Sequence, residues 1–597
     1  MLTQAIETFK KIYDESGEAL ITGSYIPADG EYLVIGEVDN ELKEIGRVPI
    51  KMDKKTKKVD STYDYFDFIA NADYMSQLIS TDKPIEGKKK IQSNNYLSFI
   101  VKKESIALKL RNEIVGENKI KAEDKKKELT IEMIDNYYDI LEDPLKKYTK
   151  NKKEARDLYI SVEKKNGKVN IERLNKIREW VKNNVFSLVS KDSTDKGYLK
   201  IFFHCDLEEY EKESEKYFIP NIYNKTNFNI KIDEITYGLP DNNMGLNDKK
   251  PYLKNMTRKT KVPYLISTDE VFSQKSFFDY LMNMAMSGYS NIYIDDKDIS
   301  KYKNGELLDS DFTGIYLRIQ KGKELEIHDM DTVTGYRPEV KTLYFEHVLD
   351  VDINNLKQTY QDINRLEGIQ SLVNEVFFSK MLVSNYFTEA KDIKITDSNL
   401  KRNILLSRNS LFTWFYKGSS VTVWKTLDKI SLSLVKSDIL NEYYVDTVEI
   451  FNLRCSLKTY FEGGEKMIDI LGEIKNNLRE KISQVETTYF ANDKEYFFAI
   501  GQIAKYLISK SKAKKKPHSL INPIINSKSD ERIKEELKRL YIKYNYDIYG
   551  NKRFDNVYMM INKYKPSGKV DDDLIIAGFL DSNLIYESSK KDGADNE

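Results

Sequence analysis

The sequence predicts an α+β N-terminal region followed by an all-α C-terminal helical bundle. First, 597 residues include only 12 prolines and 26 glycines, so few positions interrupt regular structure. Second, all our strand candidates fall before residue 320. Third, apolar residues recur about every 3.6 positions from residue 353 onward, as they do on one face of an α-helix.

Helices and strands alternate in the first 200 residues. Residues 1–11 have the amphipathic pattern of a helix rather than that of a signal peptide. Residues 31–37 and 96–101 have strand composition between turn-rich flanks. The alternation of Ile106, Leu108 and Leu110 also predicts a strand, whereas the apolar spacing over 131–141 predicts a helix.

Residues 198–350 are expected to form short strands joined by turns. The strand candidates are 199–203, 291–294 and 314–319. Residues 206–215 carry six acidic side chains, which we interpret as the solvated face of a helix.

The rest of the chain is predicted to be nearly all helix. The helical spacing covers 353–377, and further helices are expected at 426–436, 438–460, 466–485, 493–512, 529–546, 552–563 and 571–587. The predicted domains are an N-terminal α+β domain with a charged helical insert (1–197), an α/β region with a basic loop (198–350), a helical region (351–466) and a helical bundle (467–597).

The composition excludes several classes of protein. Apolar residues make up 40% of the chain, which excludes wholesale disorder. No apolar run approaches the ~18 residues that a membrane span needs. Cys205 and Cys455 are too few for a disulfide framework or a four-cysteine zinc site. We therefore expect a cytoplasmic protein without a membrane partner.

Catalytic motifs are absent from the sequence. It contains no Walker-type phosphate loop, no G-x-S-x-G nucleophile elbow and no H-E-x-x-H zinc motif. Only four histidines are present, which limits general-base catalysis near neutral pH. The sequence therefore predicts no enzyme, no metal and no cofactor. One alternative is a metal-dependent nuclease that uses His328, Asp329 and Asp331; the other interpretation of this cluster is a surface turn.

The first of three basic, turn-rich clusters spans residues 88–103, which hold five lysines and no acid. Lysines supply charge for phosphates, and Ser and Asn can contact phosphates or base edges. The candidate nucleic-acid contacts are Lys88, Lys89, Lys90, Ser93, Asn94 and Asn95. A basic loop that merely leads into a strand fits the charge equally well.

The second cluster follows a Gly/Asn/Pro turn system that begins at Gly238. Residues 249–261 contain six basic residues and no acid. The candidate contacts here are Asn242, Asn243, Asn247, Lys249, Lys250, Lys254, Arg258, Lys259 and Lys261. Asn can pair with adenine, and Arg or Lys with guanine. The alternative is a long structural loop held by its apolar residues.

The third cluster lies near the C-terminus. Residues 505–543 hold twelve basic and four acidic residues. The candidate contacts are Lys510, Lys512, Lys514, Lys515 and Lys516. A helical bundle with such an edge could hold a single strand through its phosphates. A solvated connector between two helices is the alternative.

These clusters resemble the large subunit of the type I-B CRISPR interference complex (Cascade), with a small-subunit-like C-terminal region. The resemblance rests on residues 88–99, 238–253, 257–265, 497–520 and 576–587, and it spans almost the whole chain. It implies a non-catalytic subunit at the 5′ end of a guide RNA. Such a subunit helps to recognise the protospacer-adjacent motif in double-stranded target DNA, stabilises the opened R-loop with its displaced strand, and recruits a helicase-nuclease.

The resemblance also has a limit and an alternative. Some relatives carry Cys-x-x-Cys pairs, which this chain lacks, so zinc binding is not implied. A purely structural scaffold, which would assemble with other Cascade subunits without adding DNA affinity, remains a further possibility.

Residues 462–466 suggest a second product of the same gene. Glu-Gly-Gly-Glu can be encoded by a purine-rich stretch that acts as a ribosome-binding site, and Met467 follows one residue later. Translation from Met467 would give a separate small subunit comprising residues 467–597. An ordinary Gly-Gly break between helices explains the same peptide sequence.

Overall fold

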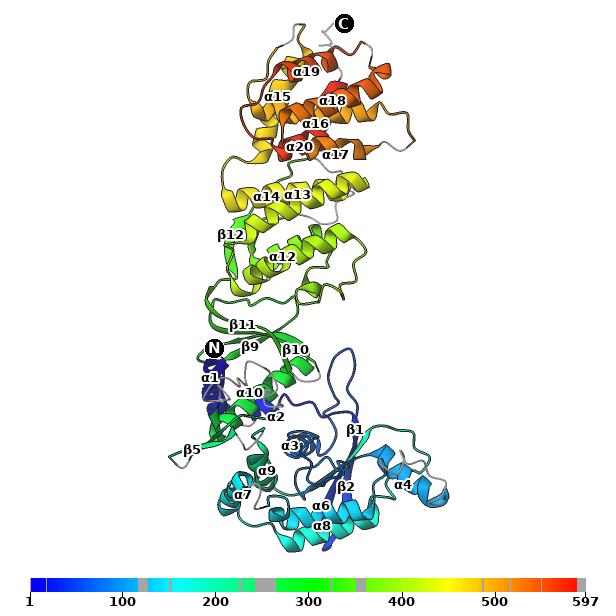
Figure 1. Ribbon diagram of the computed structural model, residues 1–597, viewed down its shortest axis with the longest axis vertical. Coiled ribbons are helices and arrows are strands. Elements are labelled where there is room, and N and C mark those ends of the chain that lie inside the picture. The colour runs from blue at the N-terminus through cyan, green and yellow to red at the C-terminus, as the bar shows by residue number, and fades with distance from the viewer. Residues whose placement is uncertain are drawn as a thin grey trace, which may run out of the picture. The chain divides into compact units, whose positions relative to one another are not determined.

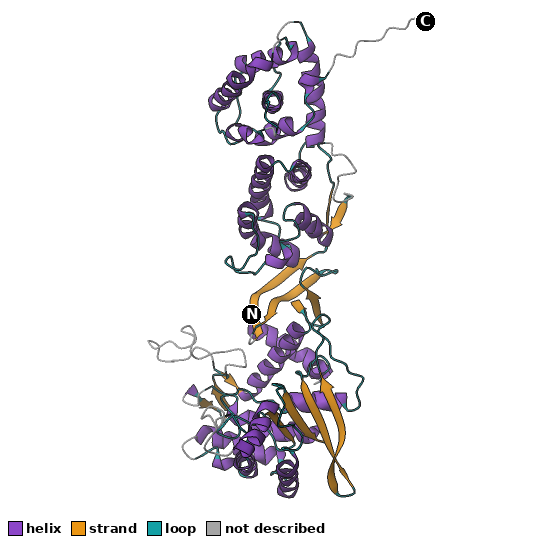
Figure 2. Ribbon diagram, turned by 90° about the vertical axis from the view of Figure 1, so that its right-hand side faces the viewer, coloured by secondary structure: helices purple, strands orange, loops and turns teal. Residues whose placement is uncertain are grey.

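The computed structural model describes residues 2–17, 19–115, 127–149, 153–224, 228–233, 235–241, 265–322, 325–349, 361–485, 488–514, 517–548 and 550–587. The chain divides into two compact units (Figure 1). Unit 1 comprises residues 1–303 and 314–332, and unit 2 comprises residues 304–313 and 333–597. The predicted architecture is confirmed, because the β-sheets precede a C-terminal region of many helices (Figure 2).

Unit 1 contains a four-stranded sheet with the order β2-β1-β4-β3. Its strands are β1 (Gly30–Val38), β2 (Glu41–Ile50), β3 (Ser98–Lys102) and β4 (Tyr198–Phe203). β1 and β4 are parallel and central, and both are buried along most of their length, as expected for strands covered on both faces. Because β4 pairs with β1 and β3, the predicted boundary between residues 197 and 198 falls inside this unit.

Helices pack around this sheet. They are α3 (Phe66–Met75), α4 (Lys103–Val115), α6 (Ile131–Glu142), α7 (Lys153–Asn166), α8 (Ile171–Asn184) and α9 (Leu207–Asn221). The predicted strand at Ile106–Leu110 is wrong, because these residues lie in α4. Ile106 and Leu110 are four positions apart, a spacing that suits one face of a helix as well as alternate positions of a strand. The acidic segment 206–215 begins α9 as expected, and Tyr210 is buried on its inner face.

A second group of elements completes unit 1. It contains α1 (Leu2–Ser16), α2 (Ala19–Thr22), α10 (Thr268–Met286) and a sheet with the order β11-β10-β8-β9. The strands are β8 (Tyr289–Ile294), β9 (Ile299–Lys303), β10 (Phe312–Lys321) and β11 (Leu325–Tyr336), of which residues 312–313 and 333–336 are counted with unit 2. Phe9 of the predicted N-terminal helix packs on Phe277 of α10. A small sheet is formed by β5 (Ile230–Ile232), β6 (Ile235–Gly238) and β7 (Ile266–Ser267).

Unit 2 begins with the β12–β13 pair and four helices. The elements are β12 (Glu339–Leu343), β13 (Ile363–Arg365), α11 (Leu366–Val376), α12 (Ser398–Lys417), α13 (Val423–Asn441) and α14 (Tyr444–Glu462). The expectation of helix at Ile363 is wrong, because Ile363 pairs with Leu343 in an antiparallel ladder. The helix begins three residues later, at Leu366.

A bundle of helices ends the chain. It contains α15 (Met467–Ser483), α16 (Asp493–Ser509), α17 (Asn522–Ile525), α18 (Asp530–Tyr544), α19 (Lys552–Lys563) and α20 (Asp572–Leu580). The predicted helices of this part are confirmed, although 493–512 and 571–587 end earlier than expected. α16 is buried around most of its circumference, so it forms the core of the bundle.

Two glycines allow α16 and α20 to approach closely. A Cβ atom at Gly501 would lie 2.1 Å from the carbonyl oxygen of Ile575, and one at Gly578 would lie 2.1 Å from that of Phe498. Only a residue without a Cβ fits either position. Gly501, in the segment 497–520, and Gly578, in the segment 576–587, therefore both have a packing role.

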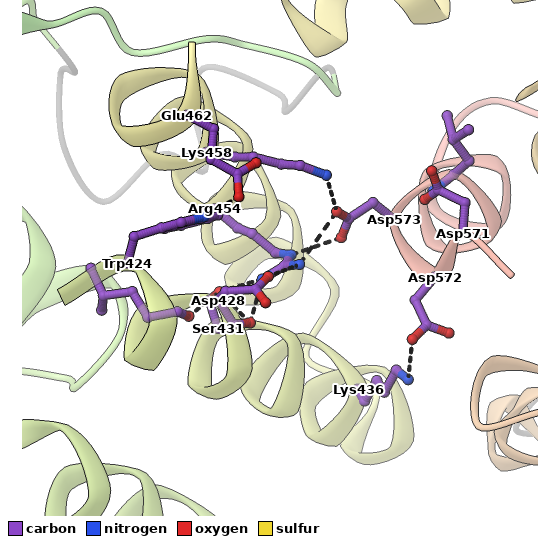
Figure 3. A network of polar contacts seen from close by, with 12 residues as sticks. Trp424, Asp428, Ser431, Lys436, Arg454, Lys458, Glu462, Asp571, Asp572 and Asp573 are labelled. Carbon is purple, nitrogen blue, oxygen red and sulfur yellow. Dashed lines mark hydrogen bonds and ion pairs between the residues drawn. The ribbon is translucent and has the colours of Figure 1, made fainter. Parts of the chain in front are cut away.

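A buried charge network joins α20 to α13 and α14 (Figure 3). Arg454 of α14 donates from Nε to Asp573 Oδ1 at 2.7 Å and from Nη2 to Asp428 Oδ1 at 2.8 Å. Lys458 donates to Asp573 at 3.1 Å, and Lys436 forms an ion pair with Asp572 at 3.3 Å. The first turn of the last bundle helix is therefore held by cations from the preceding helices.

Among the residues that the structure describes, no helix combines the length and apolar character needed to cross a membrane. Cys205 and Cys455 are both free thiols, and burial raises the pKa of Cys205 to about 12.

Candidate nucleic-acid interface

The backbone of the first basic loop is fixed by an acid. The carboxylate of the buried Glu86 accepts from the backbone N–H groups of Lys88 and Lys90, each at 2.5 Å. Lys88 and Lys89 are exposed, and Lys89 forms an ion pair with Asp82 at 2.7 Å. Both of those side chains are largely solvated, so the pair contributes little stability and leaves Lys89 able to exchange partners. Partial burial lowers the pKa of Lys90.

Ser93, Asn94 and Asn95 have a structural role, which corrects their assignment as nucleic-acid contacts. All three are at most 1% exposed. Asn94 Nδ2 donates to the carbonyl oxygens of Met75 at 2.7 Å and Gln77 at 2.8 Å, and Asn95 Nδ2 donates to Asn94 Oδ1 at 2.7 Å. Because buried polar groups need such partners, these side chains hold the loop against α3 and are not presented to a ligand.

The second cluster, from Asn242 to Lys261, lies outside the described residues, but its attachment points are well defined. Asp241, immediately before it, forms an ion pair with Lys83 at 2.8 Å, and its backbone N–H donates to Ile222 at 2.7 Å. After it, Ile266 of β7 pairs with Gly238 of β6. The two ends of the basic segment are therefore anchored on one small sheet, and Lys83, from the stretch that leads to Lys88, holds one of them.

Gly238 is needed for close packing rather than for an unusual turn. A Cβ atom there would lie 2.4 Å from Cδ1 of Tyr223 and 2.5 Å from Oδ1 of Asn229. The hydroxyl of Tyr223 donates to the carbonyl oxygens of Thr236 and Ile266, at 2.9 and 3.2 Å. Gly238, which the sequence predicted to be part of a turn system, therefore serves to pack the small sheet against Tyr223.

The third cluster contains lysines that lie against tyrosine rings. Lys510 Nζ is 4.6 Å from the ring centroid of Tyr506 and 5.1 Å from that of Tyr586. Lys512 Nζ is 4.8 Å from the ring centroid of Tyr546. Lys512 and Lys514 are exposed, whereas Lys515 and Lys516 lie outside the described residues. We call Tyr506, Lys510, Lys512, Tyr546 and Tyr586 the tyrosine–lysine patch.

Some basic residues counted in this cluster make internal hydrogen bonds that hold the fold together. Lys505 donates to the carbonyl oxygens of Leu580 and Asp581, at 3.1 and 2.5 Å, and burial lowers its pKa. Lys534 donates to the carbonyl oxygen of Tyr564 at 2.5 Å. The local charge excess therefore overstates what is available to a ligand. Of the candidate contacts in this cluster that the structure describes, Lys512 and Lys514 are exposed and Lys510 is half-buried.

The tyrosines of the patch were not among the predicted site residues. Tyr506 of α16 and Lys510, which caps the end of that helix, are four positions apart, a spacing that places them on one helical face. That pair could have been found in the sequence, whereas Tyr546 and Tyr586 join the patch only through the fold.

The acidic cluster proposed for a nuclease lies along β11. Adjacent strand residues point to opposite faces, so His328 projects away from the side that carries Asp329 and Asp331. His328 Nε2 lies 3.2 Å from Glu326 Oε2. Within the described ranges, no group of three His, Cys, Asp or Glu side chains is arranged to hold a metal ion.

No protein-family model, curated protein or solved structure matches this chain.

Proposed function

We propose that this chain is a non-catalytic subunit of an RNA-guided antiviral surveillance complex of the type I-B Cascade class. In this role it binds guide RNA and double-stranded target DNA, recognises the protospacer-adjacent motif, stabilises the displaced strand and recruits a helicase-nuclease. Base pairing with the guide reads the target sequence, so the protein itself needs only to recognise a short motif and hold phosphate backbones.

The observation that carries this proposal is the exposure of lysines at two of the three clusters in which the sequence resembles that family. Lys88, Lys89, Lys512 and Lys514 are all exposed, and Lys512 lies beside an exposed tyrosine. Cations and aromatic rings on one surface suit a nucleic acid, because they engage phosphates and bases respectively. The anchored ends of the basic segment 242–264 support the same role for the second cluster.

The first test removes four basic residues of that segment. Lys249, Lys250, Arg258 and Lys259 changed together to Ala are expected to abolish binding of the assembled complex to target duplex DNA, because each lost cation removes a phosphate contact or a base contact. Binding is measured by gel shift of a duplex that contains the recognised motif.

The matched control removes the same charge elsewhere. Lys51, Lys54, Lys55 and Lys58 lie in an exposed turn after β2, and their replacement by Ala removes four positive charges without touching a candidate site. The control variant should retain target binding. Equal loss in both variants would mean that only net charge matters, and unchanged binding in the first would contradict the loop assignment.

The separate small subunit remains part of the proposal. Met467 is the first residue of α15, and both Gly463 and Gly464 have positive φ angles, of 71° and 92°. The bundle thus begins immediately after a glycine break, where an independently translated product could start. A fragment that begins at Met467 should be present in wild-type extract and absent after Met467→Leu. A wild-type extract without it would contradict this hypothesis.

A further inference from the structure

Two partly exposed tyrosine rings are held in fixed positions at one edge of the C-terminal bundle. Tyr546 is 43% exposed and Tyr586 is 53% exposed. The Tyr586 hydroxyl forms a hydrogen bond with Ser509 Oγ at 2.6 Å, and the Tyr546 hydroxyl donates to the carbonyl oxygen of Lys510 at 3.3 Å. The polar ends of both rings are therefore tied to the end of α16, while much of each side chain is left to solvent.

Beneath this edge, the aromatic rings form a continuous series. Tyr586 contacts Tyr506 with ring centroids 4.9 Å apart, and Tyr506 stacks on Phe554 of α19 at 5.1 Å. Phe554 stacks in turn on Tyr558 at 5.5 Å. Because Tyr506 and Phe554 are buried, the exposed ring of Tyr586 rests on a rigid support and loses little entropy when a ligand stacks on it.

Lysines are spaced along the same edge. Lys510 lies against Tyr586, the Tyr546 hydroxyl reaches the backbone of Lys510, and Lys512 lies against Tyr546. Rings and cations thus alternate along one continuous surface. A nucleic-acid single strand has the matching alternation of planar bases and phosphates, whereas a duplex keeps its bases stacked inside.

We propose that the tyrosine–lysine patch binds single-stranded nucleic acid by stacking bases on Tyr546 and Tyr586, while Lys510 and Lys512 pair with the adjoining phosphates. This inference rests on the proposed function and extends it. A surface that held the strand by charge alone would contact only the phosphates, whereas this patch also contacts the bases. Stacking is tolerant of sequence, so the patch accepts any unpaired strand.

The test compares two single strands that carry the same charge. The full-length protein is titrated into a fluorescently labelled DNA of about 20 nucleotides, long enough for such a site, and into an abasic strand with the same number of phosphates. Fluorescence anisotropy gives the two dissociation constants. The wild-type protein should bind the base-bearing strand about tenfold more tightly, or more, because each stacked base adds affinity that the abasic strand lacks.

Two double variants separate the ring from its hydroxyl. Tyr546→Leu with Tyr586→Leu should lose most of the preference for bases, whereas Tyr546→Phe with Tyr586→Phe should keep it. Tyr489→Leu, at a 68% exposed tyrosine outside the patch, serves as the control and should behave as the wild type does. Circular dichroism and thermal unfolding establish that each variant is folded.

The outcomes distinguish this inference from the proposed function. Equal affinity of the wild type for the base-bearing and abasic strands would overturn stacking and leave charge-based binding in place. An unchanged preference in the folded leucine double variant would also overturn it. Failure of the wild type to bind either strand would overturn both the inference and the proposed stabilisation of the displaced strand by this bundle, while the duplex-binding test of the assembled complex decides the rest of the proposed function.

Discussion

Arg454 shows how a single buried charge fixes the position of a helix. The residue is 3% exposed, and its guanidinium bonds to Asp573 and Asp428 and also to Ser431 Oγ at 2.8 Å. Burial alone would raise the pKa of Asp573, but the charge of Arg454 and its hydrogen bonds outweigh burial and lower that pKa below its ordinary value. The folded state therefore favours the ionised pair.

Loss of one partner of this pair should be costly. Asp573→Ala leaves Arg454 buried without its main counter-charge, and such breaks destabilise proteins by about 3–5 kcal/mol. Chemical denaturation measures the free energy of unfolding. Combined replacement of Arg454 by Met and Asp573 by Leu should recover much of the loss, because it leaves no buried charge unpaired. Asp428 and Lys458 each lose a partner, but their side chains are 46% and 39% exposed and can be solvated. A single variant as stable as the wild type would contradict the assigned role.

The same pair sets a pH dependence. Because the pKa of Asp573 is lower in the folded state, its stabilising contribution is complete above about pH 4 and is lost as the pH falls through the lowered value. Between pH 5 and 3, the wild type should lose more unfolding free energy than the Arg454→Met, Asp573→Leu variant. Identical pH profiles would show that this pair does not titrate as described.

At the scale of elements, the crossing of α16 and α20 depends on glycine. Gly501→Ala should destabilise the protein by about 1–3 kcal/mol or more, because the new methyl group overlaps the backbone of α20. Thermal and chemical unfolding measure the loss. Gly472→Ala, in α15, is the matched control: nothing lies within 4 Å of its added Cβ, and Ala favours helix by up to about 1 kcal/mol over Gly. Equal effects would contradict the close crossing.

Periodicity predicted the elements best where burial lies on one face. Most helices of the C-terminal bundle were found in this way, whereas the strands β1 and β4, which are buried on both faces, were found from their strand composition. The strand prediction at Ile106, Leu108 and Leu110 was wrong because the intervening Ala107 is also apolar and buried. The apolar residues therefore fit the spacing of a helix as well as that of a strand. The helix prediction at Ile363 was wrong because this residue pairs with β12, twenty positions earlier in the chain. Such long-range pairing leaves little trace in the local sequence.

The exposure of the candidate site residues was predicted in part, while their role as nucleic-acid contacts stays a prediction. Lysines 88, 89, 512 and 514 are exposed, as a phosphate-binding role requires. The polar residues Ser93, Asn94 and Asn95 were misassigned, because composition cannot distinguish a buried hydrogen-bonding residue from an exposed one. Tyr546 and Tyr586 were missed because they reach the lysines from separate short helices, which only the folded bundle brings together.

At the scale of the whole molecule, equal numbers of acids and bases leave no net charge to attract nucleic acid. Many cations are used internally: Lys83, Lys200 and Arg454, for example, bond to buried carboxylates or carbonyl groups. The proposed binding to nucleic acid would therefore depend on local clusters of exposed cations, and a small number of substitutions in them should alter it strongly.

The salt dependence of single-strand binding by the full-length protein tests this central claim most directly. The logarithm of the association constant should fall linearly with the logarithm of salt concentration, by about 0.7 for each phosphate contact. Lys512→Ala with Lys514→Ala should reduce the magnitude of that slope by about 1.4, since two contacts are lost, and should leave the fold intact. A wild-type affinity that does not change with salt, or an unchanged slope in the folded double variant, would contradict the account.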